Sequence, residues 1–297
     1  MRELTLQTIR PLIRRALQED AASWDLTSRA TIPPTCELSA KIIAKTSGIL
    51  AGVDVAVWTF QDVDSTLQCK VIRRDGTVLT DGATILTVKG RARSVFAAER
   101  TALNMLGHLS GVATLTQQFV KRVRSTRAKI LDTRKTLPGL RELQKYAVRV
   151  GGGDNHRMGL HEAILIKTNH VRAYSVQRIA DRQQAETGIE ELVRKAKRQA
   201  GRRIVEVEVR NMKEFQAALN AGPNMILLDN WRIQDIRKAV ALRRSYTLSA
   251  KRCTLEVSGG ITLANVRAIA KTGVDRISVG RLTHSAPSLD LCLEVIP

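Results

Sequence analysis

Residues 130–170 read ILDTRKTLPGLRELQKYAVRVGGGDNHRMGLHEAILIKTNH, and this stretch decides the predicted fold. Two short apolar runs, Ile130–Leu131 and Ala163–Ile166, are each followed directly by polar and basic residues, Asp132–Thr136 and Lys167–His170. Ligands of α/β proteins bind at the carboxyl ends of parallel strands. The pattern therefore predicts two strands of an α/β protein, with a site for an anionic ligand at their carboxyl ends.

Apolar runs alternate with helical stretches from residue 127 onward, which is typical of a parallel sheet or barrel. The runs predict six strands, at Ala128–Leu131, Ala163–Ile166, Ile204–Val209, Met225–Leu228, Thr254–Val257 and Arg276–Val279. A charged or glycine-rich group stands at or just beyond the end of each, namely Arg134 with Lys135, Lys167, Glu208, Asp229, Ser258 with Gly259 and Gly260, and Gly280. Because the carboxyl ends of barrel strands converge at the mouth, these groups are predicted to share one site.

The glycine-rich turn Ser258–Gly260 is a candidate phosphate site. It precedes a predicted helix at Leu263–Lys271, so bare backbone N–H groups and a helix N-terminus would face the anion. An ordinary turn between a strand and a helix is the alternative. Gly280 and His284 repeat the pattern after the last strand, which favours phosphate binding.

The first 112 residues predict a separate α/β unit. The pattern indicates a helix over residues 4–19 and strands at Leu38–Ala44, Leu67–Arg73 and Thr84–Val88. A long helix is expected to begin at Ser94, whose side chain can cap Phe96 or Ala97. Its polar stripe is interpreted as the solvent-exposed face, and consists of Arg100, Asn104 and His108.

Composition fits one large globular domain or two modest ones, with 297 residues of which 43% are hydrophobic. The four cysteines are scattered, without a CxxC motif, so neither a zinc site nor a disulfide framework is indicated and a reducing cytoplasm is expected. No secretory signal is expected, because the N-terminal segment has no uninterrupted apolar core. The longest apolar run, Gly48–Phe60, contains Asp54 and is too short to span a bilayer.

Net charge is the compositional outlier, at +20 with a pI of about 10.5. Binding to nucleic acid is one interpretation of this charge. The basic residues are dispersed, however, and the aromatic content of 3% leaves few side chains for base stacking. A solvated basic surface that steers small anions is the favoured interpretation.

An ordered series of motifs resembles the quinolinate phosphoribosyltransferase family. The series consists of Ala98–Asn104, Leu109–Thr114, Asp132–Arg141, Gly151–Leu160, Lys167–His170, Glu206–Val209, Leu228–Asn230, Glu256–Gly260 and Gly280–Ser285. It extends over nearly the whole chain, and so many motifs in one order are highly specific.

The resemblance implies an α/β protein of two domains. Residues 1–112 would form an N-terminal α/β sandwich, residues 113–284 an open barrel-like domain of about six parallel strands, and residues 285–297 a tail that returns to the sandwich. The family is usually dimeric, so a homodimer or a higher oligomer of dimers is expected, with Arg100 acting in the partner's site. No association with a membrane is expected.

The implied reaction takes quinolinate and phosphoribosyl pyrophosphate to nicotinate mononucleotide, pyrophosphate and carbon dioxide, as a step of NAD biosynthesis. Quinolinate is a dicarboxylate, and guanidinium groups match carboxylates in bidentate geometry. The residues that the resemblance assigns to its carboxylates are Arg100, Arg134, His156 and Arg157.

The remaining implied roles concern phosphoribosyl pyrophosphate. Lys135 and Lys167 would add positive charge near the pyrophosphate and the pyridine ring. Glu208 and Asp229 would lie by the ribose and bind Mg²⁺, directly or indirectly, where carboxylates stabilise an oxocarbenium-like transition state. The 5-phosphate would be held by Ser258, Gly259, Gly260, Gly280 and His284.

Three features depart from the family pattern. Thr168 stands where an aspartate is usual, and Gly107-His108 replaces Gln-Arg. The segment 171–203 is longer than usual, with predicted apolar helix positions at Ile179, Ala185, Ile189, Leu192 and Ala196. Two alternatives therefore stay open: a molybdenum-transport-associated paralogue with a different substrate, which Thr168 and His108 favour, and a basic nucleic-acid-binding protein.

Overall fold

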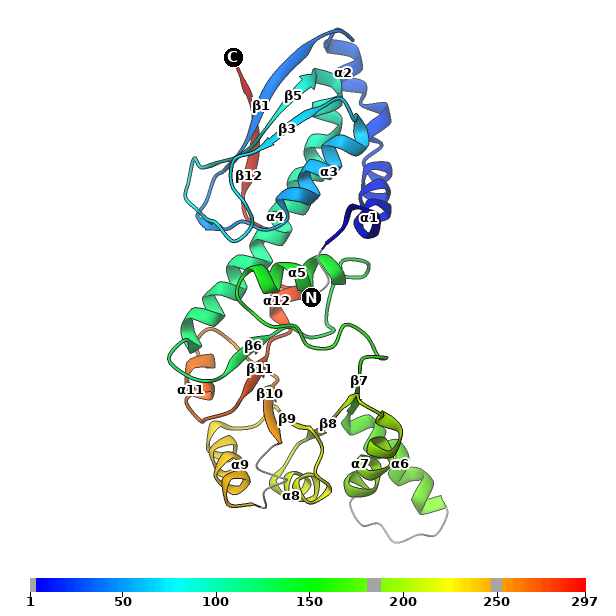
Figure 1. Ribbon diagram of the computed structural model, residues 1–297, viewed down its shortest axis with the longest axis vertical. Coiled ribbons are helices and arrows are strands. Elements are labelled where there is room, and N and C mark those ends of the chain that lie inside the picture. Colours follow the sequence, from blue (N-terminus) through cyan, green and yellow to red (C-terminus); the bar gives the residue numbers. More distant parts are fainter. Residues whose placement is uncertain (1–3, 181–187, 247–252) are drawn as a thin grey trace. The chain divides into compact units, whose positions relative to one another are not determined.

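The computed structural model describes residues 4–180, 188–246 and 253–297 (Figure 1). The chain forms two compact units. The first consists of Met1–Gln117, Lys135–Gly153 and Arg281–Pro297, and the second of Gln118–Arg134 and Asp154–Gly280. This division follows packing within each unit, and the predicted domain limits at residues 112 and 284 stay a prediction.

The first unit is built on an antiparallel sheet with strand order β12-β1-β5-β3. The strands are β1 (Glu37–Ala44), β3 (Gln68–Val71), β5 (Thr84–Arg91) and β12 (Leu291–Ile296), and a short pair is formed by β2 (Gly48–Ile49) and β4 (Val78–Leu79). Strand β12 pairs with β1 from Ser39↔Ile296 to Ala44↔Leu291, so the end of the chain is part of the N-terminal sheet.

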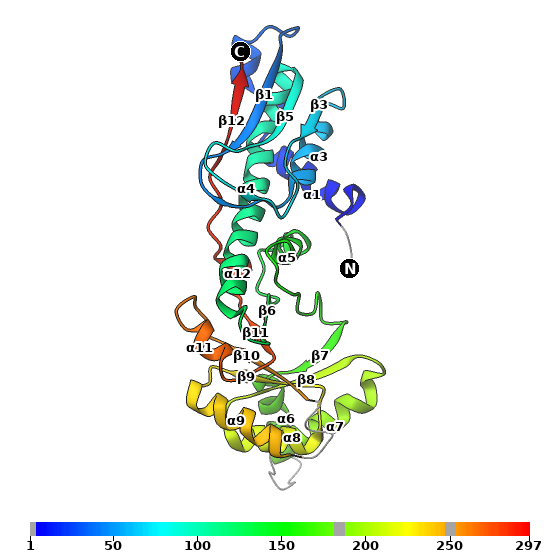
Figure 2. The same cartoon turned by 60° about the vertical axis from the view of Figure 1, so that its left-hand side comes forward.

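Helices α3 (Val53–Val63) and α4 (Ala92–Val123) pack against one face of this sheet (Figures 1 and 2). The other helices of the unit are α1 (Leu6–Glu19), α2 (Leu26–Thr31), α5 (Arg141–Val150) and α12 (Arg281–His284), with a 3₁₀ turn at Ala22–Trp24. Alternate residues of β1, including Ala40 and Ile42, lie in one buried core with Phe60 of α3 and Leu106 of α4. Apolar residues recur at every second position on the strands and at every third or fourth position on the helices. Each element therefore has one apolar face, and these faces pack together.

Helix α4 differs from its prediction in two respects. It begins at Ala92, directly after β5, and Ser94 lies inside it with Oγ donating to Asp64 Oδ2 at 2.8 Å. The predicted cap at Ser94 is therefore wrong, because the hydroxyl has a partner outside the helix. On the predicted polar stripe, Arg100 and Asn104 are exposed but His108 is half-buried.

The second unit holds six strands in the order β6-β11-β10-β9-β8-β7, and every pairing is parallel. The strands are β6 (Lys129–Leu131), β7 (Ala163–Ile166), β8 (Ile204–Val209), β9 (Met225–Asp229), β10 (Thr254–Ser258) and β11 (Arg276–Ser278). Within the described residues β6 and β7 do not pair, so the barrel is open. The predicted fold class, an α/β sandwich with an open barrel-like sheet of about six parallel strands, is confirmed.

Helices follow the strands of this unit along its outer side (Figure 2). They are α6 (Thr168–Ala180), α7 (Ile189–Ala200), α8 (Met212–Ala221), α9 (Ile233–Ser245) and α11 (Val266–Ala270). On α7 the buried residues are Ile189, Val193 and Ala200, whereas the predicted positions Leu192 and Ala196 are half-buried. Ala185 lies outside the described residues, as does the Ile179 side chain. No helix in the described parts of the chain is long and apolar enough to cross a membrane.

The helix predicted at Leu263–Lys271 is shorter than expected, since α11 begins at Val266. The preceding turn is held by reciprocal bonds in which Thr262 N–H donates to Asn265 Oδ1 and Asn265 N–H donates to Thr262 Oγ1, at 2.8 and 3.3 Å. The helix is therefore shorter than predicted at both ends, and phosphate binding at Ser258–Gly260 stays a prediction.

Candidate active site

The inner face of the open barrel carries two layers of polar side chains, because alternate residues of a strand point to the same side. The inner layer consists of Glu206 on β8, Glu256 on β10 and Arg276 on β11. The outer layer lies two residues further along, at the carboxyl ends of the strands, and consists of Glu208, Asp229 and Ser258. The parallel register places Glu206 beside Met225 and Glu256 beside Leu227, so β9 separates the two inner glutamates.

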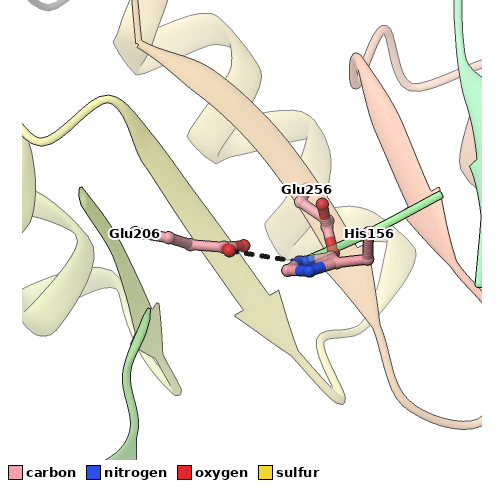
Figure 3. Close-up of side chains that lie close together, drawn as sticks. All are labelled: His156, Glu206 and Glu256. Atoms are coloured by element: carbon pink, nitrogen blue, oxygen red, sulfur yellow. Dashed lines mark ion pairs between the residues drawn. The ribbon is translucent and has the colours of Figure 1, made fainter. Parts of the chain in front are cut away.

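His156 completes the inner layer (Figure 3). Its Nε2 lies 3.2 Å from Glu206 Oε2 and 3.4 Å from Glu256 Oε1. Glu256 Oε2 lies 3.0 Å from Arg276 Nε. The side chains of His156, Glu206 and Glu256 are 8%, 2% and 0% exposed, so the ion pairs between them are removed from water. Buried charges of this kind are stable only when they are paired.

The cluster holds a proton well above neutral pH. Burial by itself lowers the pKa of His156, but hydrogen bonds to Glu206 and Glu256 outweigh it and raise this pKa to about 9. Burial, together with the charge of Glu256, raises the pKa of Glu206. In the neutral ring the proton is on Nε2, between the two carboxylates, and Nδ1 accepts the N–H of Arg157 at 2.8 Å. The charged ring carries a proton on Nδ1 as well and cannot accept this bond.

Asp132, which is fully buried, orients the segment that carries His156 and Arg157. Its Oδ1 accepts the N–H of His156 at 2.9 Å, and its Oδ2 accepts Asn155 Nδ2. Arg157 in turn donates from Nη1 to the carbonyl of Ala163, the first residue of β7, at 2.7 Å. These bonds fix the position of the main chain at Arg157 and the direction of its side chain.

Arg157 and Arg134 form a cationic pair in the second unit. Burial lowers the pKa of Arg157, and the neighbouring charge of Arg134 lowers it further. Two guanidinium groups that repel one another in a partly buried site are stabilised when an anion binds between them. Lys167, which is exposed, follows directly after β7 and adds a third cation to the carboxyl ends of the strands.

In the outer layer, uncharged donors hold the two carboxylates. Glu208 Oε1 accepts both the N–H and the hydroxyl of Thr168, at 3.1 and 2.6 Å. Asp229 Oδ2 accepts Asn230 Nδ2 at 3.0 Å. Among the described residues no hydrogen bond reaches Glu208 Oε2 or Asp229 Oδ1, which leaves one oxygen of each carboxylate for a ligand.

The turn after β10 requires glycine. Gly259 has a φ of +89° and a side chain there would meet Asn230, since an added Cβ would lie 2.3 Å from Asn230 Oδ1. Gly260 also has a positive φ, of +61°. Asn230 itself lies in the left-handed region, with its N–H donating to the carbonyl of Ser258 at 2.9 Å. The turns after β9 and after β10 are therefore in contact through Asn230 and Gly259.

Comparison with known proteins gives the family of this chain. The sequence model of the quinolinate phosphoribosyl transferase C-terminal domain matches residues 112–294, and that of the N-terminal domain matches residues 25–110. The chain belongs to the quinolinate phosphoribosyl transferase family.

Relatives in this family are similar over nearly their full length. A nicotinate-nucleotide pyrophosphorylase [carboxylating] of Mycobacterium leprae is 43% identical over 289 residues, which is 96% of each chain. A probable enzyme of the same name from Bacillus subtilis is 37% identical, over 97% of this chain and 93% of its own. The solved structure of the nicotinate-nucleotide pyrophosphorylase from Francisella tularensis gives a TM-score of 0.88 at 39% identity, with 99% and 98% of the two chains covered.

Most of the predicted site residues of this quinolinate phosphoribosyl transferase family member fall in the second unit. They are Arg134, His156, Arg157, Lys167, Glu208, Asp229, Ser258, Gly259, Gly260 and Gly280. Arg100, Lys135 and His284 belong to the first unit, where all three are exposed. His156 is one of the residues predicted to bind the carboxylates of the substrate. In the structure its Nε2 faces the carboxylates of Glu206 and Glu256.

Four residues that hold the site received no predicted role: Asp132, Glu206, Glu256 and Arg276. The run Ile204–Val209 reads IVEVEV, and two glutamates at a spacing of two in a strand occupy the same face. That spacing signals the pair Glu206 and Glu208, but nothing in the sequence indicates that Glu206 meets Glu256 through His156.

Two sets of residues have the ligand atoms of a cation site. His156, Glu206 and Glu256 bring their ligand atoms within 4.8 Å of one another, but Arg276 already neutralises Glu256. Glu208 and Asp229 offer carboxylate oxygens, the ligands that Mg²⁺ prefers. The donor set of the outer layer therefore fits the magnesium ion that the family resemblance implies.

Proposed function

We propose that this protein is a carboxylating phosphoribosyltransferase. It takes quinolinate and phosphoribosyl pyrophosphate to nicotinate mononucleotide, pyrophosphate and carbon dioxide, in NAD biosynthesis. The observation that carries this proposal is that the second unit of this family member holds both the cations Arg134, Arg157 and Lys167 and the carboxylates Glu208 and Asp229.

The cations suit a dicarboxylate substrate. Arg134 and Arg157 would bind the carboxylates of quinolinate with bidentate hydrogen bonds, and the binding of a dianion relieves the repulsion between them. His156, held by Glu206 and Glu256, and Asp132, which accepts the N–H of His156, would hold the segment that carries Arg157. In the homodimer that we propose, Arg100 serves the substrate of the partner.

The carboxylates suit the sugar. As pyrophosphate leaves, positive charge develops on the ribose, and Glu208 and Asp229 would stabilise it. Magnesium bound with pyrophosphate would neutralise the leaving group. Glu208 and Asp229 would hold this ion through Glu208 Oε2 and Asp229 Oδ1, the oxygens that the structure leaves without a protein donor among its described residues.

The phosphates require donors and cations. Ser258, Gly259, Gly260 and Gly280 would present backbone N–H groups and a hydroxyl to the 5-phosphate, with His284 as a further donor. Lys135 would bind the pyrophosphate. Backbone donors suit this role because a phosphate needs close approach, which the glycines permit.

Decarboxylation follows from the product of the first step. When the ring nitrogen attacks the ribose carbon, the carbon–oxygen bond to pyrophosphate breaks and the ring becomes a pyridinium. The carbon–carbon bond to the adjacent carboxylate then breaks, carbon dioxide leaves, its electron pair stays on the ring carbon, and a proton replaces it. The protein contributes positioning and electrostatic stabilisation to both steps.

The test is an assay of purified protein with quinolinate, phosphoribosyl pyrophosphate and Mg²⁺, in which carbon dioxide and nicotinate mononucleotide are both measured. We expect the two products in equal amounts, and a loss of about a hundredfold or more in kcat/KM for Arg134→Ala or Lys167→Ala, each with its fold intact. Arg194→Ala is the matched control, because the Arg194 side chain is 62% exposed and pairs with Glu190 on the surface of α7. Turnover of another pyridine acid without turnover of quinolinate would contradict the proposal.

A further inference from the structure

A buried glutamine links three segments of the first unit. Gln144 on α5 is fully buried, and its Nε2 donates to the carbonyl of Thr283 on α12 at 2.6 Å. Its Oε1 accepts the N–H of Leu137 at 3.0 Å. The same Nε2 lies 2.9 Å from Nε2 of His108 on α4. One side chain thus connects α4, α12 and the segment that follows Arg134.

The proton positions in this network follow from its partners. The carbonyl of Thr283 only accepts and the N–H of Leu137 only donates, so the two bonds independently fix which end of the Gln144 amide is nitrogen. The second amide hydrogen then points at His108 Nε2, which must accept it. The ring of His108 is therefore neutral with its proton on Nδ1, and burial, which lowers its pKa, favours this form.

Lys135 lies between two of these anchors. Its carbonyl accepts the hydroxyl of Thr283 at 2.6 Å, and two residues later the N–H of Leu137 is held by Gln144. Thr283, itself buried, precedes His284 in α12. One amide thus holds the main chain at Lys135 and at the end of α12, and His108 accepts the second hydrogen of that amide.

We propose that His108 is a positioning residue which, through Gln144, fixes the main chain at Lys135 and at the end of α12 for the binding of phosphoribosyl pyrophosphate. This inference rests on the proposed function, which gives Lys135 the pyrophosphate and His284 the 5-phosphate. His108 itself contacts no reacting group in this scheme, and acts only by accepting one hydrogen bond from Gln144.

The test compares variants that keep or remove the acceptor. His108→Gln places an amide oxygen near the position of Nε2, whereas His108→Leu has a similar volume and no acceptor. We expect His108→Leu to raise the KM for phosphoribosyl pyrophosphate by about tenfold, the equivalent of one buried hydrogen bond, while the KM for quinolinate stays within about twofold. His108→Gln is expected to restore most of this loss.

A double variant shows whether the effect passes through Gln144. If it does, adding His108→Leu to Gln144→Leu causes little further change, because the link is already cut. Amide hydrogen exchange of residues 135–139 and 281–285 gives a second measurement that needs no turnover, and we expect faster exchange in His108→Leu and recovery in His108→Gln. A purely structural role would lower stability and the amount of active enzyme without changing the KM for one substrate.

The outcomes separate the two proposals. If the unaltered protein does not convert quinolinate, the proposed function is wrong, and the exchange pattern still decides whether His108 positions these segments. If the unaltered protein is active but His108→Leu leaves both the KM values and the exchange rates unchanged, the positioning role is overturned. Equal defects in His108→Leu and His108→Gln would also overturn it, because an acceptor would then not matter.

Discussion

Each unit of this protein has a histidine whose ring faces buried polar groups, and the two histidines are in opposite states. In the second unit, His156 Nε2 lies between the carboxylates of Glu206 and Glu256, which raise its pKa to about 9 against the effect of burial. In the first unit, His108 faces the amide of Gln144, and burial lowers its pKa. The ring of His156 donates hydrogen bonds from Nε2, and the ring of His108 accepts one at Nε2.

The difference shows that the role of a buried histidine is set by what its nitrogen meets. Carboxylates near a ring favour the charged form, whereas an amide N–H that points at the ring excludes a proton there. The cluster around His156 is costly to disturb, since it holds buried charges that compensate one another. The cluster around His108 is made of neutral groups, and its disruption leaves unpaired hydrogen-bonding groups at smaller cost.

The largest effect is expected from breaking the charged cluster. Glu256→Gln removes the carboxylate shared by His156 and Arg276 and leaves buried positive charge uncompensated, so the free energy of unfolding should fall by about 3–5 kcal/mol. Denaturant unfolding measures this. The control is Glu191→Gln, whose exposed ion pair with Lys195 contributes about 1 kcal/mol or less. Equal effects in the two variants would show that the inner layer is not a compensated cluster.

A smaller loss of stability is expected when the neutral cluster around His108 is broken. Gln144→Leu keeps the volume but leaves the carbonyl of Thr283 and the N–H of Leu137 without this partner, at a cost of about 1–3 kcal/mol. Thermal and denaturant unfolding would measure it against Gln18→Leu, an exposed position on α1 where a change within about 0.5 kcal/mol is expected. A loss as large as that of Glu256→Gln would remove the contrast between the two clusters.

The two histidines should give stability opposite dependences on pH. The folded pKa of His156 is raised, so its contribution is fully present below the unfolded value of about 6.5 and is lost as the pH rises through about 9. The folded pKa of His108 is lowered, so its contribution is present above about 6.5 and is lost as the pH falls below that value. Unfolding curves from pH 5 to 10 for the unaltered protein, His156→Gln and His108→Gln test both signs. If His108→Gln keeps the acid-side loss, that loss does not come from His108.

The smallest effect is expected at Thr168, an uncharged residue that donates hydrogen bonds to the carboxylate of Glu208. Thr168→Ala removes the hydroxyl bond to Glu208 Oε1 but keeps the backbone N–H bond to the same oxygen, so kcat should fall by less than about tenfold. Thr168→Ser retains the hydroxyl and should be close to the unaltered protein in steady-state kinetics. If serine is as defective as alanine, the methyl group rather than the hydroxyl bond supports Glu208.

The sequence predicted the strands of the second unit well, because each is a short apolar run bounded by polar residues. The predicted bounds of β7 and β8 are those of the structure, and the other four differ by a residue. Helix boundaries were less predictable. At Ser94 and at Leu263, side chains formed bonds that the local sequence does not specify, with Asp64 in one case and between Thr262 and Asn265 in the other.

The site was predictable only in its outer part. Residues at strand ends, such as Lys167, Glu208 and Asp229, are visible in the sequence because the carboxyl ends of parallel strands meet at one edge. Glu256 and Arg276 lie within strands, and their partners come from segments tens of residues away. The polar stripe on α4 was interpreted as solvent-exposed, whereas His108 is half-buried against Gln144, 36 residues along the chain.

The sequence by itself determined the fold class, the family and the carboxyl-end position of the charged residues, since local periodicity and ordered motifs carry this information. The tertiary structure alone decided which buried polar groups meet, and through that the protonation of His156 and His108. The physical reason is that a pKa and a hydrogen-bond direction depend on burial and on charges within a few ångströms, and folding rather than sequence distance sets those neighbours.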